Sequence, residues 1–169
     1  MLNKNKKEGF TLIELLVVIA IIGMLAAGVM VSMGSARSKA RDARRISDIK
    51  NLDLAITLYF DSSSTMPFQL SDLVTAGFIK SVPTDPSTLA PYSYVSYGKT
   101  TYGGVTRCSN YHLGTVLEQG NTALASDQDT APANQTNICN GTAFAGSSAD
   151  CGATQLSNDS SDKCFDVGN

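Results

Sequence analysis

The stretch Leu15–Met33, LLVVIAIIGMLAAGVMVSM, decides the fold of this 169-residue chain. It contains no charged residue, and its length corresponds to about 28 Å of α-helix at 1.5 Å per residue. That length is close to the roughly 30 Å of hydrocarbon in a bilayer, so the stretch predicts a membrane-spanning helix. A fully buried core helix is the alternative, but a chain of this size rarely surrounds so many apolar residues on all sides.

Charge divides the chain into two parts. Residues 1–60 carry nine basic and five acidic side chains, whereas residues 61–169 carry four basic and ten acidic ones, which gives the net charge of −2. A basic front and an acidic back indicate two different surroundings. The overall balance does not indicate a nucleic-acid partner. With one histidine in the chain, a His-rich metal site is excluded, and the composition does not predict an enzyme.

A cleavable secretory signal is a second interpretation of the apolar stretch. Lysines at positions 4, 6 and 7 provide a positive start, and Gly34–Ala36 offers a small-residue cleavage site. Two features count against it. The apolar stretch is longer than the usual 7–15 residues, and Glu14 stands at its beginning, where a removable signal has no use for a carboxylate.

Glu14 needs a partner. An ionised carboxylate in hydrocarbon is costly and persists when it is paired or functional. The next basic residue on its C-terminal side is Arg37, far beyond helical reach. A counter-charge must therefore come from elsewhere.

The segment Lys6–Gly23, KKEGFTLIELLVVIAIIG, resembles the leader and N-terminus of type IV pilins and type II secretion pseudopilins. The resemblance implies cleavage by a prepilin peptidase after Gly9, N-methylation of the new terminus Phe10, and retention of the apolar helix. It also implies that Glu14, the fifth mature residue, pairs with the terminal ammonium of a neighbouring subunit. The implied partners are further copies, minor pilins, the peptidase/methyltransferase, an inner-membrane assembly platform and the membrane.

The helix is predicted to continue to about Asp61, since no proline occurs before Pro67. Apolar residues recur at spacings of three and four. Their side chains are small at first and larger from residue 46 on: Ala36, Ala40, Ala43, Ile46, Ile49, Leu52, Ile56 and Tyr59. This pattern is typical of an amphipathic helix. Its alanine-lined part is expected to face neighbouring subunits, and its Ile- and Leu-lined part is expected to face the chain's own sheet. The five basic residues between 37 and 45 are interpreted as a solvated face near lipid headgroups.

The remainder predicts a short helix and several strands. Residues 71–77 form the expected helix, with Ser71 as a possible N-cap and Gly77 after its end. Strands are expected at 91–98, 110–118 and 163–167, with a possible turn at Gly103-Gly104. Residues 77–94 resemble the stretch before the first strand of major pseudopilins. The prediction is an α+β fold, the pilin ladle, with a long helix packed on a small antiparallel sheet and a long loop-rich C-terminal region.

All four cysteines follow the apolar helix, namely Cys108, Cys139, Cys151 and Cys164. An even number on one side of a membrane helix predicts two disulfides in an oxidising compartment, with three possible pairings. The sequence contains no C-x2-C pair, so the spacing of the cysteines does not indicate a zinc site.

Asp127 and Asp129, with Asn121 and Glu118 nearby, offer oxygen ligands for calcium. Their spacing is not that of an EF-hand. The resemblance adds that major pseudopilins bind calcium in a comparable loop. A solvated acidic loop without metal is the alternative, and no other cofactor is predicted.

The expected organisation has four parts: a cleaved cytoplasmic leader (1–9), a transmembrane and filament-core helix (10–34), an amphipathic helix (35–61) and an extracytoplasmic head (62–169). The expected function is that of a structural subunit of a type IV pilus or a type II secretion pseudopilus. The precursor would span the inner membrane once, and the assembled form would be a surface pilus or a periplasmic pseudopilus. The alternative is a monomeric, membrane-anchored extracytoplasmic binding module, in which Glu14 would have no partner.

Overall fold

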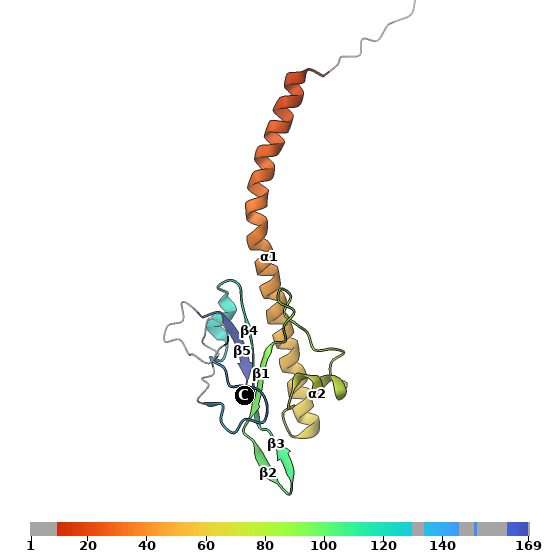
Figure 1. Ribbon diagram of the computed structural model, residues 1–169, viewed down its shortest axis with the longest axis vertical. Helices are drawn as coiled ribbons and strands as arrows, with labels where there is room; N and C mark the ends of the chain where they lie inside the picture. Colours follow the sequence, from red (N-terminus) through yellow and green to blue (C-terminus); the bar gives the residue numbers. More distant parts are fainter. Residues whose placement is uncertain (1–9, 130–133, 146–150, 152–161, 169) are drawn as a thin grey trace, which may run out of the picture. The chain divides into compact units, whose positions relative to one another are not determined.

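A computed structural model describes residues 10–129, 134–145, 151 and 162–168. The fold is α+β, as predicted: a long helix, α1 (Leu12–Ser63), precedes a short helix and small antiparallel sheets (Figure 1). The chain divides into two compact units, Met1–Arg37 and Ser38–Asn169. The first unit contains the apolar part of α1, and the second contains the rest of α1 and the head elements.

The course of α1 follows from its sequence, and its observed bounds lie within two residues of the predicted ones. Its most apolar 18-residue window has a mean hydropathy of 2.7, and none of that window is buried. The helix is therefore long and apolar enough to cross a membrane. It ends where Ser64 adopts a left-handed backbone (φ 57°) and donates its N–H to the carbonyl of Phe60.

In the second unit, α1 buries one face against the head. Ile49, Leu52 and Ile56 are all at most 1% exposed, as the i, i+3, i+7 spacing predicts. The same face continues towards the N-terminus through polar residues, because Asp42 and Arg45 are 2% exposed. The alanines at 36, 40 and 43 are exposed instead.

The short helix α2 (Leu70–Thr75) buries Leu70 and Leu73 in the core. Gln69, rather than the predicted Ser71, is its N-cap, and it forms a capping box with Asp72. Gly77 follows its end with φ 82°, as predicted for a C-terminal glycine.

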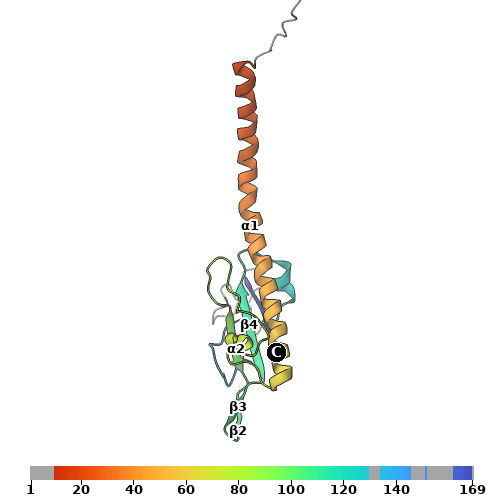
Figure 2. The ribbon, with the colours of Figure 1, turned by 90° about the vertical axis from the view of Figure 1, so that its right-hand side faces the viewer.

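Three strands form the main sheet in the order β1 (Ser93–Tyr97), β4 (Asn110–Val116), β5 (Cys164–Gly168), and both pairings are antiparallel. Side chains alternate between the two faces, as the period of two requires. One face, with Tyr111, Leu113 and Phe165, joins the core under α1 (Figure 2). The other carries a second cluster of Val95, Tyr97, Phe144, Cys151 and Cys164.

A hairpin that the sequence did not predict lies between β1 and β4. It consists of β2 (Thr100–Tyr102) and β3 (Val105–Arg107), and the predicted turn residues Gly103 and Gly104 join its two strands. Both glycines have positive φ, 58° and 79°, the backbone of a tight hairpin turn that other residues rarely adopt. A 3-10 helix, η1 (Thr122–Ser126), precedes the acidic loop.

Candidate functional site

The start of α1 holds Glu14 in a capping box. Glu14 Oε2 accepts hydrogen bonds from the backbone N–H and the hydroxyl of Thr11, at 2.8 and 2.6 Å, and Glu14 N–H donates to Thr11 Oγ1 at 3.3 Å. A Thr-x-x-Glu box of this kind satisfies donors that a helix start otherwise leaves unpaired. Phe10, immediately before it, is 88% exposed, and Gly9 lies outside the described residues. The carboxylate thus has a local role in addition to the predicted one between subunits.

The apolar surface of the first unit is uncovered along the whole described length. Its large side chains, from Phe10 to Met30, are between 47% and 88% exposed. A Cβ added at Gly23 or Gly28 would meet no atom within 4 Å, so nothing in a single chain requires glycine there. Small residues such as Gly23 and Ala27, four apart, let helix backbones approach each other closely in apolar surroundings. This surface is suited to helices of other chains.

In the head, Arg45 is the centre of a buried ion-pair network. Its guanidinium donates to Asp42 (2.7 Å), Asp85 (2.5 Å) and Glu118 (2.8 Å), three acidic residues that are far apart in the sequence. Arg41 donates to both oxygens of Glu118, at 2.7 and 2.5 Å. The network ties α1 to the loop after α2 and to the segment after β4.

The network shifts the pKa of its members in the directions that ion pairing requires. The hydrogen bond from Arg45 holds the pKa of Asp85 well below its usual range. Hydrogen bonds from Arg41, and then Arg45, lower the pKa of Glu118 to about 2. Two of the five basic residues in 37–45 therefore serve the fold. The prediction of one continuous solvated basic face is wrong for Arg45, whose side chain is 2% exposed.

The disulfides are Cys108–Cys139 and Cys151–Cys164. The first connects the start of β4 to the loop that runs beside β1, where Cys139 N–H donates to the carbonyl of Ser96 at 2.8 Å. The second fixes the start of β5. The cysteines thus attach the loop-rich region to the sheet, as two disulfides were predicted to do.

Asp127 and Asp129 approach a third carboxylate, that of Asp162. One oxygen from each lies within 4.8 Å of the others. Both carboxylate oxygens of Asp127 are buried without a hydrogen-bond donor in the described part of the chain. Burial, together with the nearby carboxylates of Asp166, Asp129 and Asp162, raises the pKa of Asp127 to about 8.

The other two residues considered for this site lie elsewhere. Glu118 belongs to the network of Arg45, and Asn121 caps η1 by accepting the N–H of Ala123 at 3.0 Å. Asp162 was missed because 33 positions separate it from Asp129, and no local pattern indicates that the two meet. The sequence feature that could have placed Asp162 is Cys164, two residues later, because its disulfide attaches this segment to the head.

His112, in strand β4, is completely buried. Gln135 accepts the N–H of Phe144 through Oε1 and donates to the Phe144 carbonyl through Nε2, which fixes its amide orientation. The same Nε2 lies 2.9 Å from His112 Nδ1, so Nδ1 is the acceptor of this hydrogen bond. Its Nε2–H then donates to Asp166. The ring also stacks on Phe144 with centroids 3.9 Å apart, and a Cβ at Gly114 would meet that phenyl ring at 2.8 Å.

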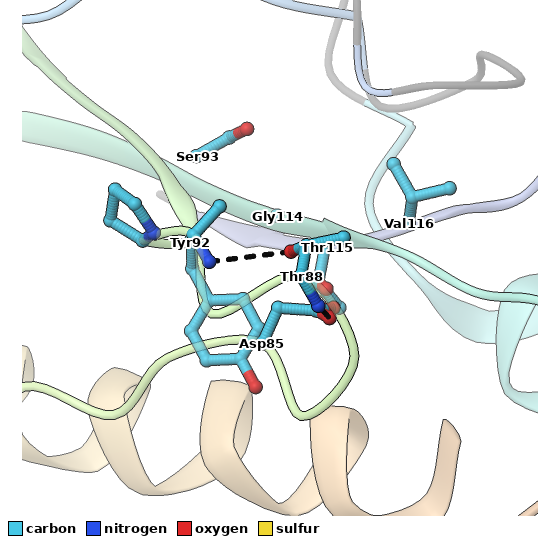
Figure 3. A pocket seen from close by; sticks show the side chains of 9 residues that line it. Asp85, Thr88, Tyr92, Ser93, Gly114, Thr115 and Val116 are labelled. Carbon is cyan, nitrogen blue, oxygen red and sulfur yellow. Dashed lines mark hydrogen bonds between the residues drawn. The ribbon is translucent and has the colours of Figure 1, made fainter. Parts of the chain in front are cut away.

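The hollow beside Asp85 offers no catalytic arrangement (Figure 3). It has a volume of about 190 Å³ and lies between the loop before β1 and strand β4. Its one carboxylate, Asp85, already accepts hydrogen bonds from Arg45, from Ser87 and from the N–H of Thr88, the last at 2.9 Å. Among its lining residues no nucleophile stands beside a free base.

Comparison with known proteins decides the family. Residues 4–30 match the model of the prokaryotic N-terminal methylation motif. The chain is 33% identical over 113 residues to type II secretion system core protein G of Vibrio cholerae, an alignment that covers 58% of this chain and 77% of the relative. The chain belongs to the family of type IV pilins and type II secretion pseudopilins. The core protein G of Escherichia coli K12 is 32% identical over 98 residues, covering 48% and 68%, and that of Aeromonas hydrophila 32% over 114 residues, covering 58% and 79%.

No solved structure matches this pseudopilin-family chain. The methylation-motif match contains Gly9, Phe10 and Glu14, the residues on which the resemblance depended. Membership of a family of structural pseudopilin subunits fits the prediction that the chain is not an enzyme.

Proposed function

We propose that the chain is a subunit of a type II secretion pseudopilus and polymerises through the apolar part of α1. The single observation that carries this proposal is the uncovered helix surface of the first unit, because none of its most apolar 18-residue window is buried. Relatives named as core proteins of the type II secretion system favour the pseudopilus over a surface pilus. In this account the helix anchors the precursor in the inner membrane, and the head is periplasmic.

Maturation creates the group that Glu14 requires. Cleavage after Gly9 frees an α-ammonium on Phe10, which methylation leaves cationic. In apolar surroundings an unpaired carboxylate is strongly disfavoured, whereas a carboxylate–ammonium pair offsets part of the desolvation cost. Pairing with the Phe10 terminus of the adjacent copy would hold each new subunit at one axial position. The Thr11 cap keeps Glu14 satisfied until that copy arrives.

The maturation enzyme, the minor pilins and the assembly platform are the further partners of this proposal. Their contacts belong to the first ten residues and to the apolar helix. The monomeric binding module is the competing function, and it requires neither cleavage nor a polymer.

Isolating fibres from the periplasm of lysozyme-treated cells and analysing them tests the proposal. We expect fibres that contain this chain, with N-methylated Phe10 as the first residue by mass spectrometry. A chain that keeps residues 1–9, or that is never found in fibres, would contradict the proposal and favour the monomeric module.

We also propose calcium as a ligand of the head. Three carboxylates with oxygens within 4.8 Å supply the hard, anionic donors that Ca²⁺ prefers. Asp127, Asp129 and Asp162 would hold the ion, and the ion would neutralise the repulsion that raises the pKa of Asp127. Thermal unfolding of the full chain in detergent, with calcium or with chelator, tests this, because a ligand that binds the folded state raises Tm. An unchanged Tm at millimolar calcium would contradict it.

A further inference from the structure

The hairpin β2–β3 is almost entirely exposed. Tyr102, at its tip, is 92% exposed, the highest value among the large apolar side chains that the structure describes. Val105, opposite it in the ladder, is 57% exposed. A two-stranded hairpin without a packed face is at best marginally stable in water, and exposed aromatic residues are common at the centre of protein interfaces. This hairpin is therefore expected to contact a partner.

Two local features favour one conformation of the hairpin. The Gly103-Gly104 turn fixes its tip, and the hydroxyls of Thr101 and Thr106 lie 3.2 Å apart across the two strands. A group that is already held in one conformation loses little entropy on binding. Tyr102 can thus act as a rigid side chain for insertion.

The same head contains a groove that could receive such a side chain. The groove has a volume of about 280 Å³, and its apolar walls are Phe68, Leu70, Val82, Pro91, Tyr92 and Tyr94. Small-molecule sites usually measure 300–1,000 Å³, so this groove is better matched to one side chain of a protein partner. The hydroxyl of Tyr94 donates to the carbonyl of Pro67 at 2.6 Å, which holds one wall in place.

Charge favours contact between the hairpin and the groove. Residues 99–107 contain Lys99 and Arg107 and no acidic residue, a charge of +2. The groove lining is uncharged, and Asp72 stands at its edge, where its Oδ2 accepts the N–H groups of Phe68 and Gln69. A basic hairpin approaching an acidic edge is attracted and meets no like charge in the lining.

We propose that the Tyr102 tip of one copy inserts into the Phe68–Tyr94 groove of the next copy. Figures 1 and 2 show the hairpin extending beyond the C-terminal end of α1 and beyond α2, whose Leu70 and Ser71 line the groove. Two different surfaces meet in such a contact, and repeated contacts of this kind build an open helical assembly. This inference rests on the proposed polymerisation and names the surfaces of the head that take part in it.

Two substitutions weaken the contact from its two sides. Tyr102→Ala should lower fibre recovery from the periplasm about tenfold, a loss typical of an aromatic hot spot. Ser71→Trp, which fills the groove, should have a similar effect, and the double variant should lose little more than either. Leu89→Ala is the matched control, because Leu89 is 75% exposed and lies outside the groove, so its fibre recovery should be unchanged. Recovery of the Tyr102→Ala fibres at the wild-type level would overturn the inference.

Photo-crosslinking tests the contact directly in the full-length chain. A benzophenone-bearing phenylalanine analogue replaces Tyr102, cells are irradiated, and crosslinked peptides from the isolated fibres are mapped by mass spectrometry. We expect crosslinks between copies at residues 68–71 or 91–94, and none there when the analogue stands at Leu89. Fibres whose crosslinks from position 102 reach another surface, another protein or nothing would overturn the inference and leave the proposed function intact. Absence of fibres from the unsubstituted chain would overturn both.

Discussion

At the scale of single residues, Arg45 shows how much of the head depends on one buried charge. Its guanidinium is 2% exposed and is satisfied by three carboxylates and the hydroxyl of Ser87. Asp42, also 2% exposed, in turn accepts the N–H groups of Glu118 and Gln119. Such a network is neutral or modestly stabilising when complete, and it is strongly destabilising when one member is removed.

Arg45→Leu should therefore lower the free energy of unfolding by about 3–5 kcal/mol, because it leaves the buried Asp42 and the partly buried Asp85 without their cation. Urea unfolding of the detergent-solubilised chain, followed by tyrosine fluorescence, measures this. Arg44→Leu is the matched control. Arg44 is 67% exposed and 3.8 Å from Asp48, so its loss should change stability by less than about 1 kcal/mol. Equal effects of the two substitutions would contradict the network.

Asp127 predicts a pH dependence of the opposite sign to that of an ion-paired acid. Its folded pKa of about 8 lies above its ordinary value of 3.8, so between these values the folded state retains a proton that the unfolded state has released. The corresponding stability is complete below about pH 4 and is lost as the pH rises through about 8.

In chelator, Asp127→Asn should remove this decline, so that the variant is more stable than the parent at pH 8 and similar to it near pH 4.5. The variant should also lose the stabilisation by calcium. Urea midpoints across this pH range measure both effects. Asp129→Asn is the control for charge alone, since Asp129 is exposed and should leave most of the decline. A parent whose stability does not fall towards pH 8 would contradict the buried, unpaired carboxylate.

At the scale of elements, local sequence patterns predicted the helices and strands that short-range interactions determine. The course of α1 followed from its apolar run and its three- and four-residue spacing. The main strands followed from alternation, and the helix stop at Gly77 followed from its backbone freedom. The β2–β3 hairpin was missed because its strands have three residues each and no buried side, so no alternation marks them.

Contacts between distant segments could not be predicted in the same way. From the sequence, Arg45 is indistinguishable from the other four basic residues predicted to lie on a solvated helix face. Its acidic partners at 85 and 118 become its neighbours only after folding. Asp162 likewise comes close to Asp127 and Asp129 only when the chain folds. Even cysteine counts predicted two disulfides, but the choice among three pairings depended on the sheet register that places Cys164 on the edge strand β5.

The disulfide Cys151–Cys164 should hold that edge strand in place. Replacing both cysteines by alanine opens a loop with a sequence separation of 13 and should lower the free energy of unfolding by about 3 kcal/mol on the chain-entropy account. Cys108–Cys139, with a separation of 31, should contribute slightly more. Urea unfolding of the two double variants compares them. Stability equal to that of the parent in the first variant would show that β5 is held by its ladder alone.

At the scale of the whole molecule, the two units of the chain have different roles. The first unit satisfies its backbone within α1 and leaves its apolar surface for other helices. The second unit, which joins the head to the rest of α1, has its own core, ion-pair network and two disulfides. In the proposed function, this division lets the chain reside singly in a membrane and later pack against its copies without refolding its head.

The fibre yield of Glu14→Gln tests the central claim most directly. Glutamine can still form the capping box with Thr11, so this substitution removes the charge and keeps the helix start, whereas Thr11→Ala removes the cap and keeps the charge. We predict that Glu14→Gln inserts into the membrane normally but yields at least tenfold fewer periplasmic fibres, and that Thr11→Ala assembles close to the wild-type level. Normal fibre yield from Glu14→Gln would show that the carboxylate serves the helix cap alone and would contradict the pairing between subunits.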